Sequence, residues 1–142
     1  MRAVYLDSSA AAKLFKEEPE SAALEGWLAG QDSALVLTCD LTRTELRRAL
    51  DVAGVGPDAR QECDEWLADC ALLRLNPTLC DRAGRLRPGT RLRSLDALHL
   101  AAALALGPAL LAFVAYDERL CAAAKQAGIA VVSPAEPHAE LK

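Results

Sequence analysis

Residues 2–9, RAVYLDSS, decide the fold class because an apolar strand pattern ends at Asp7 and passes at once into a helical pattern. The same arrangement returns late in the chain, where the apolar run 110–116 ends at Asp117 and a helical pattern follows. Continuous apolar runs are typical of buried parallel strands, and open parallel sheets bind ligands beyond the carboxyl ends of their strands. We therefore expect the two aspartates to meet at one edge of a sheet.

Strand and helix patterns alternate along the chain without a break that would mark a linker. Strands are predicted at residues 2–6, 34–38, 72–75, 110–116 and 129–132. Helices are predicted at about residues 9–16, 19–30, 42–54, 57–67, 77–84, 95–106 and 118–127, with Ser8 or Ser9, Asp40 or Thr42, and Ser94 as candidate N-caps. This alternation predicts an α/β fold with a mostly parallel central sheet that is covered on both faces.

The length and composition fit one domain. The chain has 142 residues, of which 52% are hydrophobic but only 4% aromatic, so we expect an aliphatic core built from Ala, Leu and Val. Residues 1–133 are predicted to form this single domain. Residues 134–142, after the last strand pattern, are predicted to form a loose C-terminal tail.

Cysteine usage and hydropathy indicate where the protein resides. The cysteines are odd in number and form no C-x-x-C pair, so neither a disulfide framework nor a zinc site is predicted. No apolar run approaches the roughly 20 residues that cross a bilayer, and no basic-then-apolar leader precedes the first strand. We expect a soluble, cytoplasmic protein with reduced thiols and no membrane contact.

Four acidic residues, Asp7, Glu45, Asp96 and Asp117, each lie where a strand or an amphipathic helix brings a carboxylate toward one end of the sheet. So much negative charge in one place requires a cation to hold it. Oxygen ligands without an accompanying Cys or His box suit Mg²⁺ or Mn²⁺ rather than zinc. Such ions suit phosphate chemistry, and the pattern therefore predicts a metal-dependent nuclease.

The charge distribution leaves two interpretations open. The net charge of −4 is unusual for a nucleic-acid enzyme, since phosphate contacts normally come from Lys and Arg. Arginines nevertheless cluster within residues 82–93 and beside Glu45, so that the surface around a metal-neutralised site would be basic. Alternatively, these arginines occupy solvated helix faces and pair with neighbouring acids. The residues concerned are Arg82, Arg85, Arg87, Arg91 and Arg93 in the first group, and Arg43, Arg47 and Arg48 in the second.

The segments around the four acids resemble the signature segments of PIN-domain proteins, specifically the VapC toxins of type II toxin–antitoxin modules. These segments are YLDSS at residues 5–9, TEL at 44–46, RSLDALHLA at 93–101 and YDERL at 116–120. The resemblance runs from Val4 to Val132. It implies a three-layer α/β/α sandwich, Mg²⁺-dependent endoribonuclease activity, homodimerisation and inhibition by a cognate antitoxin.

Position by position, the resemblance assigns Asp7, Glu45, Asp96 and Asp117 as the catalytic and metal-binding residues, with Mg²⁺ as the cofactor and RNA as the substrate. We expect Asp7 and Asp96 to be direct ligands, because one ends a central strand and the other lies in the first turn of a helix. Glu45 has a longer side chain and would bind through water or orient the attacking water. Asp117, at a helix N-cap, would complete the site or position a second ion.

Other residues near the acids have a structural and a functional interpretation. His99, three residues after Asp96, is interpreted as a packed, hydrogen-bonded histidine rather than a ligand or base. Ser8 and Ser9 are interpreted first as helix caps. Relatives often carry Thr or Ser two positions before the fourth acid, and Ala115 in this chain puts one hydroxyl contact in doubt.

Two alternatives to a nuclease remain open at this stage. A phosphoacceptor receiver domain has a similar size and an acidic Mg²⁺ pocket, but it would need an acidic pair after the first strand and a Lys after a late one. A PIN-like module that has lost catalysis and only binds a partner is the second. In either PIN case, the apolar faces of the first two helices, around Trp27 and Leu28, cover the sheet or leave a groove for a partner helix.

Overall fold

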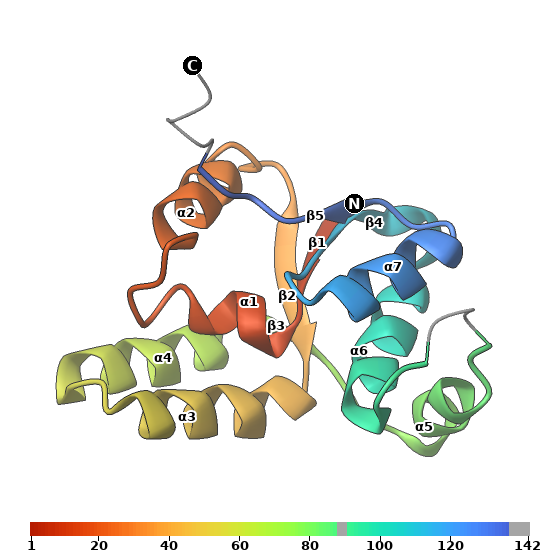
Figure 1. Ribbon diagram of the computed structural model, residues 1–142, viewed down its shortest axis with the longest axis horizontal. Helices are drawn as coiled ribbons and strands as arrows, with labels where there is room; N and C mark the ends of the chain where they lie inside the picture. Colours follow the sequence, from red (N-terminus) through yellow and green to blue (C-terminus); the bar gives the residue numbers. More distant parts are fainter. Residues whose placement is uncertain (88–90, 137–142) are drawn as a thin grey trace.

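The computed structural model describes residues 1–87 and 91–136 and contains a five-stranded, all-parallel sheet with helices on both faces (Figure 1). The strands lie in the order β3-β2-β1-β4-β5. Their bounds are β1 Ala3–Leu6, β2 Leu35–Cys39, β3 Ala71–Leu73, β4 Leu110–Val114 and β5 Val131–Val132. The predicted α/β class with a parallel sheet is confirmed.

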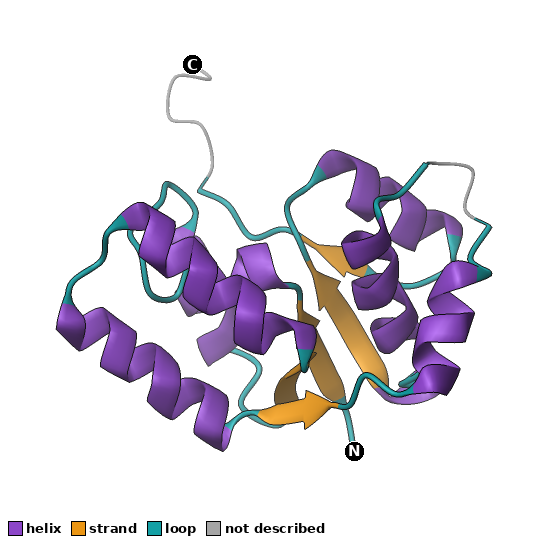
Figure 2. Cartoon of the chain, turned by 90° about the horizontal axis from the view of Figure 1, so that it is seen from below, coloured by secondary structure: helices purple, strands orange, loops and turns teal. Residues whose placement is uncertain are grey.

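The helices form two groups around the sheet (Figures 1 and 2). One group covers one side of the sheet: α1 Ser8–Ala12, α2 Ser21–Ala29, α3 Leu41–Ala53 and α4 Pro57–Asp69. The other group covers the opposite side: α5 Pro77–Gly84, α6 Ser94–Leu104 and α7 Glu118–Gln126, with a short 3₁₀ turn, η1 Gly107–Ala109, before β4.

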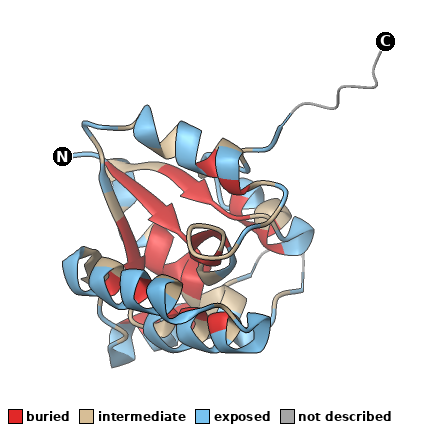
Figure 3. Cartoon of the chain, turned by 90° about the vertical axis from the view of Figure 1, so that its left-hand side faces the viewer, coloured by how far each residue is buried: buried red, intermediate tan, exposed pale blue. Residues whose placement is uncertain are grey.

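The central strand β1 is buried on both faces, which explains its continuous apolar run. Val4 and Leu6 pack with Leu24 of α2, whereas Tyr5 packs with Phe113 and the α6 helix on the other face. Successive side chains of a strand point to opposite faces, so one short segment contributes to both cores. β1 is accordingly buried along its whole length, as are the carboxyl-terminal halves of β2 and β4, whereas the outer faces of the helices are exposed (Figure 3).

A third apolar cluster fixes the orientation of α3. Leu46 and Leu50, one turn apart, are fully buried against Ala11 of α1 and Leu67 of α4. Burying a leucine side chain stabilises a protein by about 1.5–3 kcal/mol, so these contacts hold the helix firmly. Glu45, next to Leu46, is thereby placed at the edge of the cluster.

The order in which strands are added to the sheet reverses at β1: β2 and β3 lie on one side of it, and β4 and β5 lie on the other. The carboxyl ends of β1 and β4 are neighbours at this point. Both neighbours of β1 run parallel to it, but β2 follows β1 in the chain while β4 comes much later. The backbone N–H of Asp7 donates to the carbonyl of Val114 over 3.2 Å, which joins the ends of β1 and β4. Such a switch point is where open α/β sheets bind ligands.

Several predicted element boundaries are wrong by a few residues. Helix α1 ends at Ala12 rather than near residue 16, and the chain continues in turns from Lys13, whose side chain forms ion pairs with Glu18 and Glu20, both at 2.9 Å. Pro19 lies before α2 instead of in its first turn. The last strand is limited to β5, and the predicted strand 72–75 is shifted to β3.

The predicted N-caps are also corrected. Asp7, not Ser8 or Ser9, caps α1 through its side chain. Arg93 occupies the N-cap position of α6, so Ser94 is the first helical residue. The side chain of Asp40 makes no capping hydrogen bond to α3.

The first two helices mainly cover the sheet. Leu24 is fully buried, and the half-buried Trp27 and Leu28 pack against the cluster that contains Val4 and Leu6. The predicted tail falls largely outside the described residues, which end at 136. In the described part of the chain, no helix has the length and apolar character needed to span a membrane.

Candidate active site

The structure brings all four predicted acids to one cavity of about 380 Å³ at the carboxyl edge of the sheet. Asp7 comes from the end of β1, Glu45 from α3, Asp96 from the first turn of α6 and Asp117 from the N-cap of α7. The remaining lining residues are Ser8, Ser9, Ala49, Arg93 and His99. Residues up to 110 positions apart in sequence thus share one site.

Asp7 is nearly completely buried at the base of this cavity. One of its oxygens accepts a hydrogen bond from the backbone N–H of Ala10 over 2.9 Å, and the hydroxyl of Ser9 donates to the carboxylate at 3.0 Å. Burial raises the pKa of Asp7, although these hydrogen bonds act in the opposite direction. The fold therefore holds this carboxylate in a place where its negative charge is costly.

Glu45 is held by two donors from other elements. The Ser8 hydroxyl and the Nε2 atom of His99, at 2.9 Å, both donate to its Oε1 atom. Burial would raise the pKa of Glu45, but the hydrogen bonds from His99 and Ser8 outweigh it and lower the pKa. Glu45 is consequently kept ionised and oriented without any bound cation.

His99 links this carboxylate to the core of the protein. Its Nδ1 atom lies 2.8 Å from the hydroxyl of Tyr5 in β1, and its Nε2 atom faces Glu45. Burial lowers the pKa of His99, but hydrogen bonds to Cys39 and Glu45 raise it to about 10. In its protonated form the ring donates from both nitrogens, toward Tyr5 and Glu45. The interpretation of His99 as a packed, hydrogen-bonded residue fits this geometry.

A row of hydroxyls extends the network below Ser8. Ser8 Oγ lies 3.0 Å from the hydroxyl oxygen of Thr42, which in turn lies 2.7 Å from that of Thr38. Thr38 and Thr42 are both fully buried. Ser8 is thus a positioning residue for Glu45 rather than the helix cap that the sequence suggested.

Asp96 and Asp117 are held less tightly. The carboxylate of Asp96 contacts only the Arg93 side chain in the described structure, at 3.7 Å, and 21% of its side-chain surface is exposed. Burial raises the pKa of Asp96, and the negative charge of Asp117 adds to the increase while Arg93 opposes it. Asp117 is exposed and caps α7 by accepting from the N–H of Leu120 at 2.9 Å.

The donor set fits a hard divalent cation. The cavity has four carboxylates and no cysteine, and the lining nitrogen of His99 is already committed to Glu45. Oxygen-only sites suit Mg²⁺ or Mn²⁺. Burial is the main cause of the raised pKa values of Asp7 and Asp96, and a neighbouring cation would offset the cost of their buried charges.

The carboxylates are close together but not arranged as a finished ligand set. Among the residues that the structure describes, no three His, Cys, Asp or Glu side chains are placed to hold one ion. The reason is visible in their other bonds, because Glu45 turns toward His99 while Asp7 and Asp117 cap helices. Binding would therefore require small side-chain rotations.

Ala115, where a hydroxyl residue was expected, does not line the cavity. Its side chain is fully buried in the apolar cluster of β4 and α7, and its carbonyl accepts a hydrogen bond from the Ser133 hydroxyl. The acidic cavity instead contains the hydroxyls of Ser8 and Ser9.

Sequence reasoning did not include Tyr5, Thr42 or Arg93 in the site. Tyr5 carried a usable signal, because a tyrosine in the middle of a buried strand needs a partner for its hydroxyl. Arg93 was considered as a member of the arginine cluster at residues 82–93, and it does line the cavity, 3.7 Å from Asp96.

The sequence of the chain is similar to those of known proteins. Residues 4–126 match the model of the PIN domain. Ribonuclease VapC46 of Mycobacterium tuberculosis is 43% identical over 134 residues, which cover 94% of this chain and 99% of the relative. Ribonuclease VapC47 of the same species is 39% identical over 137 residues, covering 92% of this chain and 96% of that protein.

Solved structures show the same fold at much lower identity. Mycobacterium tuberculosis VapC20, described as a sarcin-ricin loop cleaving toxin, superposes with a TM-score of 0.73 at 17% identity over 92% of this chain and 99% of its own. VapBC2 from Rickettsia felis, bound to a DNA fragment from its promoter, gives a TM-score of 0.71 at 12% identity, covering 93% and 98%.

Proposed function

The chain belongs to the PIN-domain family and is homologous to VapC ribonuclease toxins along nearly its whole length, and on this basis we propose that it is a Mg²⁺-dependent endoribonuclease. It would act as the toxin of a type II toxin–antitoxin module. The observation that supports the catalytic part of the proposal is the convergence of Asp7, Glu45, Asp96 and Asp117 on one cavity. The family match leaves no reason to retain the receiver-domain alternative.

Asp7 and Asp96 are the residues proposed to hold the ion directly. Both have raised pKa values caused first by burial, so both gain most from a neighbouring positive charge. Asp117 would complete the site, and Mn²⁺ would substitute for Mg²⁺. When bound, the ion would polarise a phosphoryl oxygen and lower the pKa of a water molecule.

Glu45 is proposed to orient the attacking water. Its Oε1 atom accepts the bonds from Ser8 and His99, while Oε2 has no hydrogen-bond partner within the described part of the chain. A carboxylate with a lowered pKa is ionised at neutral pH and therefore ready to accept a hydrogen bond from water. His99 and Ser8 act as positioning residues, since they touch Glu45 rather than the reacting atoms.

The helix termini around the cavity favour a phosphate group. α6 begins at Ser94 and α7 at Glu118, and unpaired N–H groups at helix N-termini attract anions. The Arg93 side chain adds a full positive charge at the same edge. The substrate phosphate would thus meet attraction from the protein in spite of the four acids.

We further propose that a cognate antitoxin inhibits the protein, that the protein forms a homodimer, and that it acts in the cytoplasm. The structural similarity to VapBC2 from Rickettsia felis, which was solved with a DNA fragment from its promoter, supports the partner. The half-buried Trp27 and Leu28 of α2 are the proposed contact surface. Trp27→Glu should weaken retention of a co-expressed antitoxin, and full retention by a folded variant would reject this surface.

The decisive experiment is cleavage of single-stranded RNA by the purified chain. We expect cleavage with Mg²⁺ or Mn²⁺, none in EDTA, and recovery when Mg²⁺ is added back. Mg²⁺ should also raise the melting temperature, because a ligand at 100 times its Kd stabilises the folded state by about 2.7 kcal/mol. Cleavage that persists in EDTA would reject the mechanism. Metal binding without any cleavage would favour the catalytically impaired binding module.

A further inference from the structure

A second cavity, of about 560 Å³, adjoins the acidic one, and its lining contains three arginines as well as Asp96, Asp117 and Glu118. The two cavities share Arg93, Asp96 and Asp117, so they form a continuous depression. The second adds Arg91, from the segment before α6, and Arg119, from the first turn of α7. A molecule seated at the acids can therefore extend directly onto these side chains.

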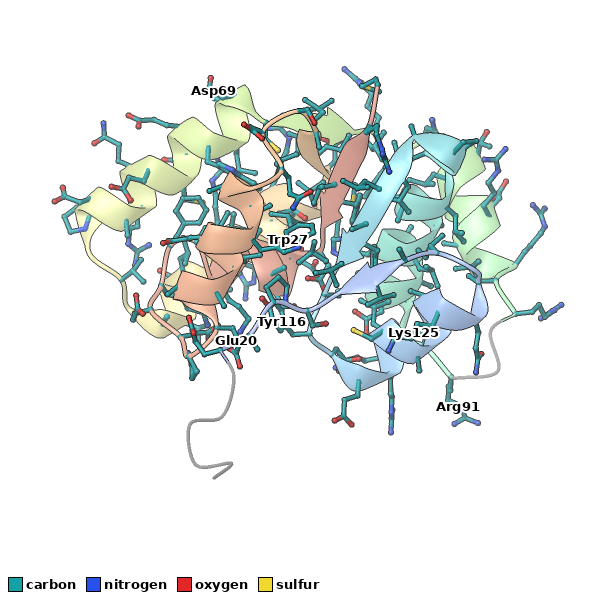
Figure 4. The ribbon with its side chains drawn as sticks, turned by 90° about the horizontal axis from the view of Figure 1, so that it is seen from above. Glu20, Trp27, Asp69, Arg91, Tyr116 and Lys125 are labelled. Carbon is teal, nitrogen blue, oxygen red and sulfur yellow. The ribbon has the colours of Figure 1, made fainter. Side chains whose placement is uncertain are left out.

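The arginine side chains are available to a ligand. Arg91, Arg93 and Arg119 are exposed, and Arg91 projects outward from the body of the protein (Figure 4). Within the described residues, Arg91 and Arg119 form no ion pair, and the single one of Arg93, to Asp96, is long at 3.7 Å. By contrast, Arg47 and Arg60 on the α3–α4 side each contact an aspartate.

The charge balance explains why such a groove is needed. The lining of the acidic cavity holds four carboxylates and a single arginine, Arg93, and the whole chain has a net charge of −4. A polyanion is repelled by this surface unless cations lie along its path. The planar guanidinium matches phosphate oxygens with two parallel hydrogen bonds, so arginines are well suited to the task.

We propose that the groove defined by Arg91, Arg93 and Arg119 binds the phosphates of the RNA strand on one side of the scissile bond. This inference rests on the proposed ribonuclease function and adds to it the path of the substrate. The acids would hold the reacting phosphate, and the groove would fix the register of the flanking nucleotides. Phosphate contacts of this kind position a strand but do not read its sequence.

The test measures binding of a fluorescently labelled, mixed-sequence, single-stranded RNA in Mg²⁺ at several salt concentrations. The double variant Arg91→Gln/Arg119→Gln should bind about 10-fold more weakly. Its plot of log affinity against log salt should flatten by about 0.7 for each lost phosphate contact. Arg2→Gln, an exposed arginine before β1 at the opposite edge of the sheet, is the matched control and should retain the wild-type slope.

Cleavage assays provide the second measurement. The KM of the double variant should rise for a long RNA, and the penalty should shrink when the nucleotides on one side of the cut are removed. If the double variant binds RNA with the affinity and salt slope of the wild type, the proposed groove is wrong. If it also loses a co-expressed protein partner, these arginines bind a protein instead of RNA. Failure of the wild type to cleave would instead overturn only the proposed function, because the binding measurement does not depend on cleavage.

Discussion

Glu45 and Asp96 line the same cavity, but their surroundings shift their pKa values in opposite directions. Glu45 accepts hydrogen bonds from Ser8 and His99, and these lower its pKa in spite of partial burial. Asp96 is also partly buried, but it has only the long contact to Arg93, and its pKa is raised.

This contrast divides the site into two regions with different physical roles. The Glu45 region is organised by the protein alone, through a network that reaches the buried hydroxyl of Tyr5. The region of Asp7 and Asp96 has unbalanced charge that the folded protein tolerates at a cost. Under the proposed mechanism, Glu45 is the carboxylate already positioned to act on water, and Asp7 and Asp96 are the two that a bound cation would stabilise.

The largest expected effect comes from the second region. Asp96→Asn should reduce RNA cleavage by at least about 100-fold, since removing a ligand lowers metal occupancy and misplaces the reacting groups. The variant should fold with an equal or higher melting temperature in EDTA, because a carboxylate with a raised pKa is lost. Asp69→Asn, an exposed acid at the end of α4, is the control and should match the wild type (Figure 4). Full activity in a folded Asp96→Asn protein would remove Asp96 from the metal site.

A smaller loss is expected when the Glu45 network is cut at His99. His99→Gln keeps one donor but removes the positive charge, so the pKa of Glu45 should rise. Cleavage should fall by about 10-fold, within the usual cost of disturbing groups that orient a metal site. In a pH–rate profile, the acid limb should move to higher pH. An unchanged rate and profile would show that Ser8 alone suffices to hold Glu45.

Much of this site follows from the sequence, because strand ends and parallel topology are local signals. The apolar runs ending at Asp7 and Asp117 identified two buried strands, and parallel strands necessarily place their carboxyl ends together. Asp96 and Glu45 were located by their helical surroundings and by the resemblance to a family. The gathering of these residues needed no knowledge of side-chain packing.

The Glu45 network could not be predicted in the same way. The hydrogen bond between Tyr5 and His99 joins residues 94 positions apart, and that between His99 and Glu45 spans 54 positions. These contacts depend on how α3 and α6 pack against β1, which single-sequence patterns do not encode.

The pH dependence of stability should separate the two regions by sign. The pKa of Asp7 is raised in the folded state, so the stability it contributes is full below its unfolded pKa, about 3.9, and is lost as pH rises through the folded value. The pKa of Glu45 is lowered, so its contribution is present above its unfolded pKa, about 4.3, and is lost as pH falls through the folded value.

Melting temperatures in EDTA between about pH 3 and 8 measure this difference. As the pH rises from about 3 to neutral, the melting temperature of Asp7→Asn should increase relative to that of the wild type, because the Asn oxygen can still cap α1 and no charge is buried. Over the same range, the melting temperature of Glu45→Gln should decrease relative to that of the wild type. A shift of a few degrees is expected in each case. Parallel trends in the two variants would contradict the division of the site.

The smallest expected effect comes from the far end of the network. Tyr5→Phe removes only the hydroxyl that lies 2.8 Å from His99 Nδ1, and it leaves the ring stacked on Phe113, with centroids 5.6 Å apart. Nδ1 then keeps only the longer contact to Cys39 Sγ, at 3.9 Å, and loses its shorter one. A buried polar group left unpaired costs about 1–3 kcal/mol, and we expect a loss of unfolding free energy at the lower end of that range.

Cleavage by Tyr5→Phe should fall by only about twofold to threefold, less than in His99→Gln, because the Nε2 bond to Glu45 is retained. Chemical denaturation measures the free energy of unfolding. The control is Tyr116→Phe, which loses a hydrogen bond to the Pro134 carbonyl and shows how much a hydroxyl that is only partly buried contributes. If Tyr5→Phe loses as much activity as His99→Gln, the position of the imidazole is set by Tyr5. If it loses no stability, the hydroxyl does not anchor the ring, and the Glu45 region is held by Ser8 and its threonine partners instead.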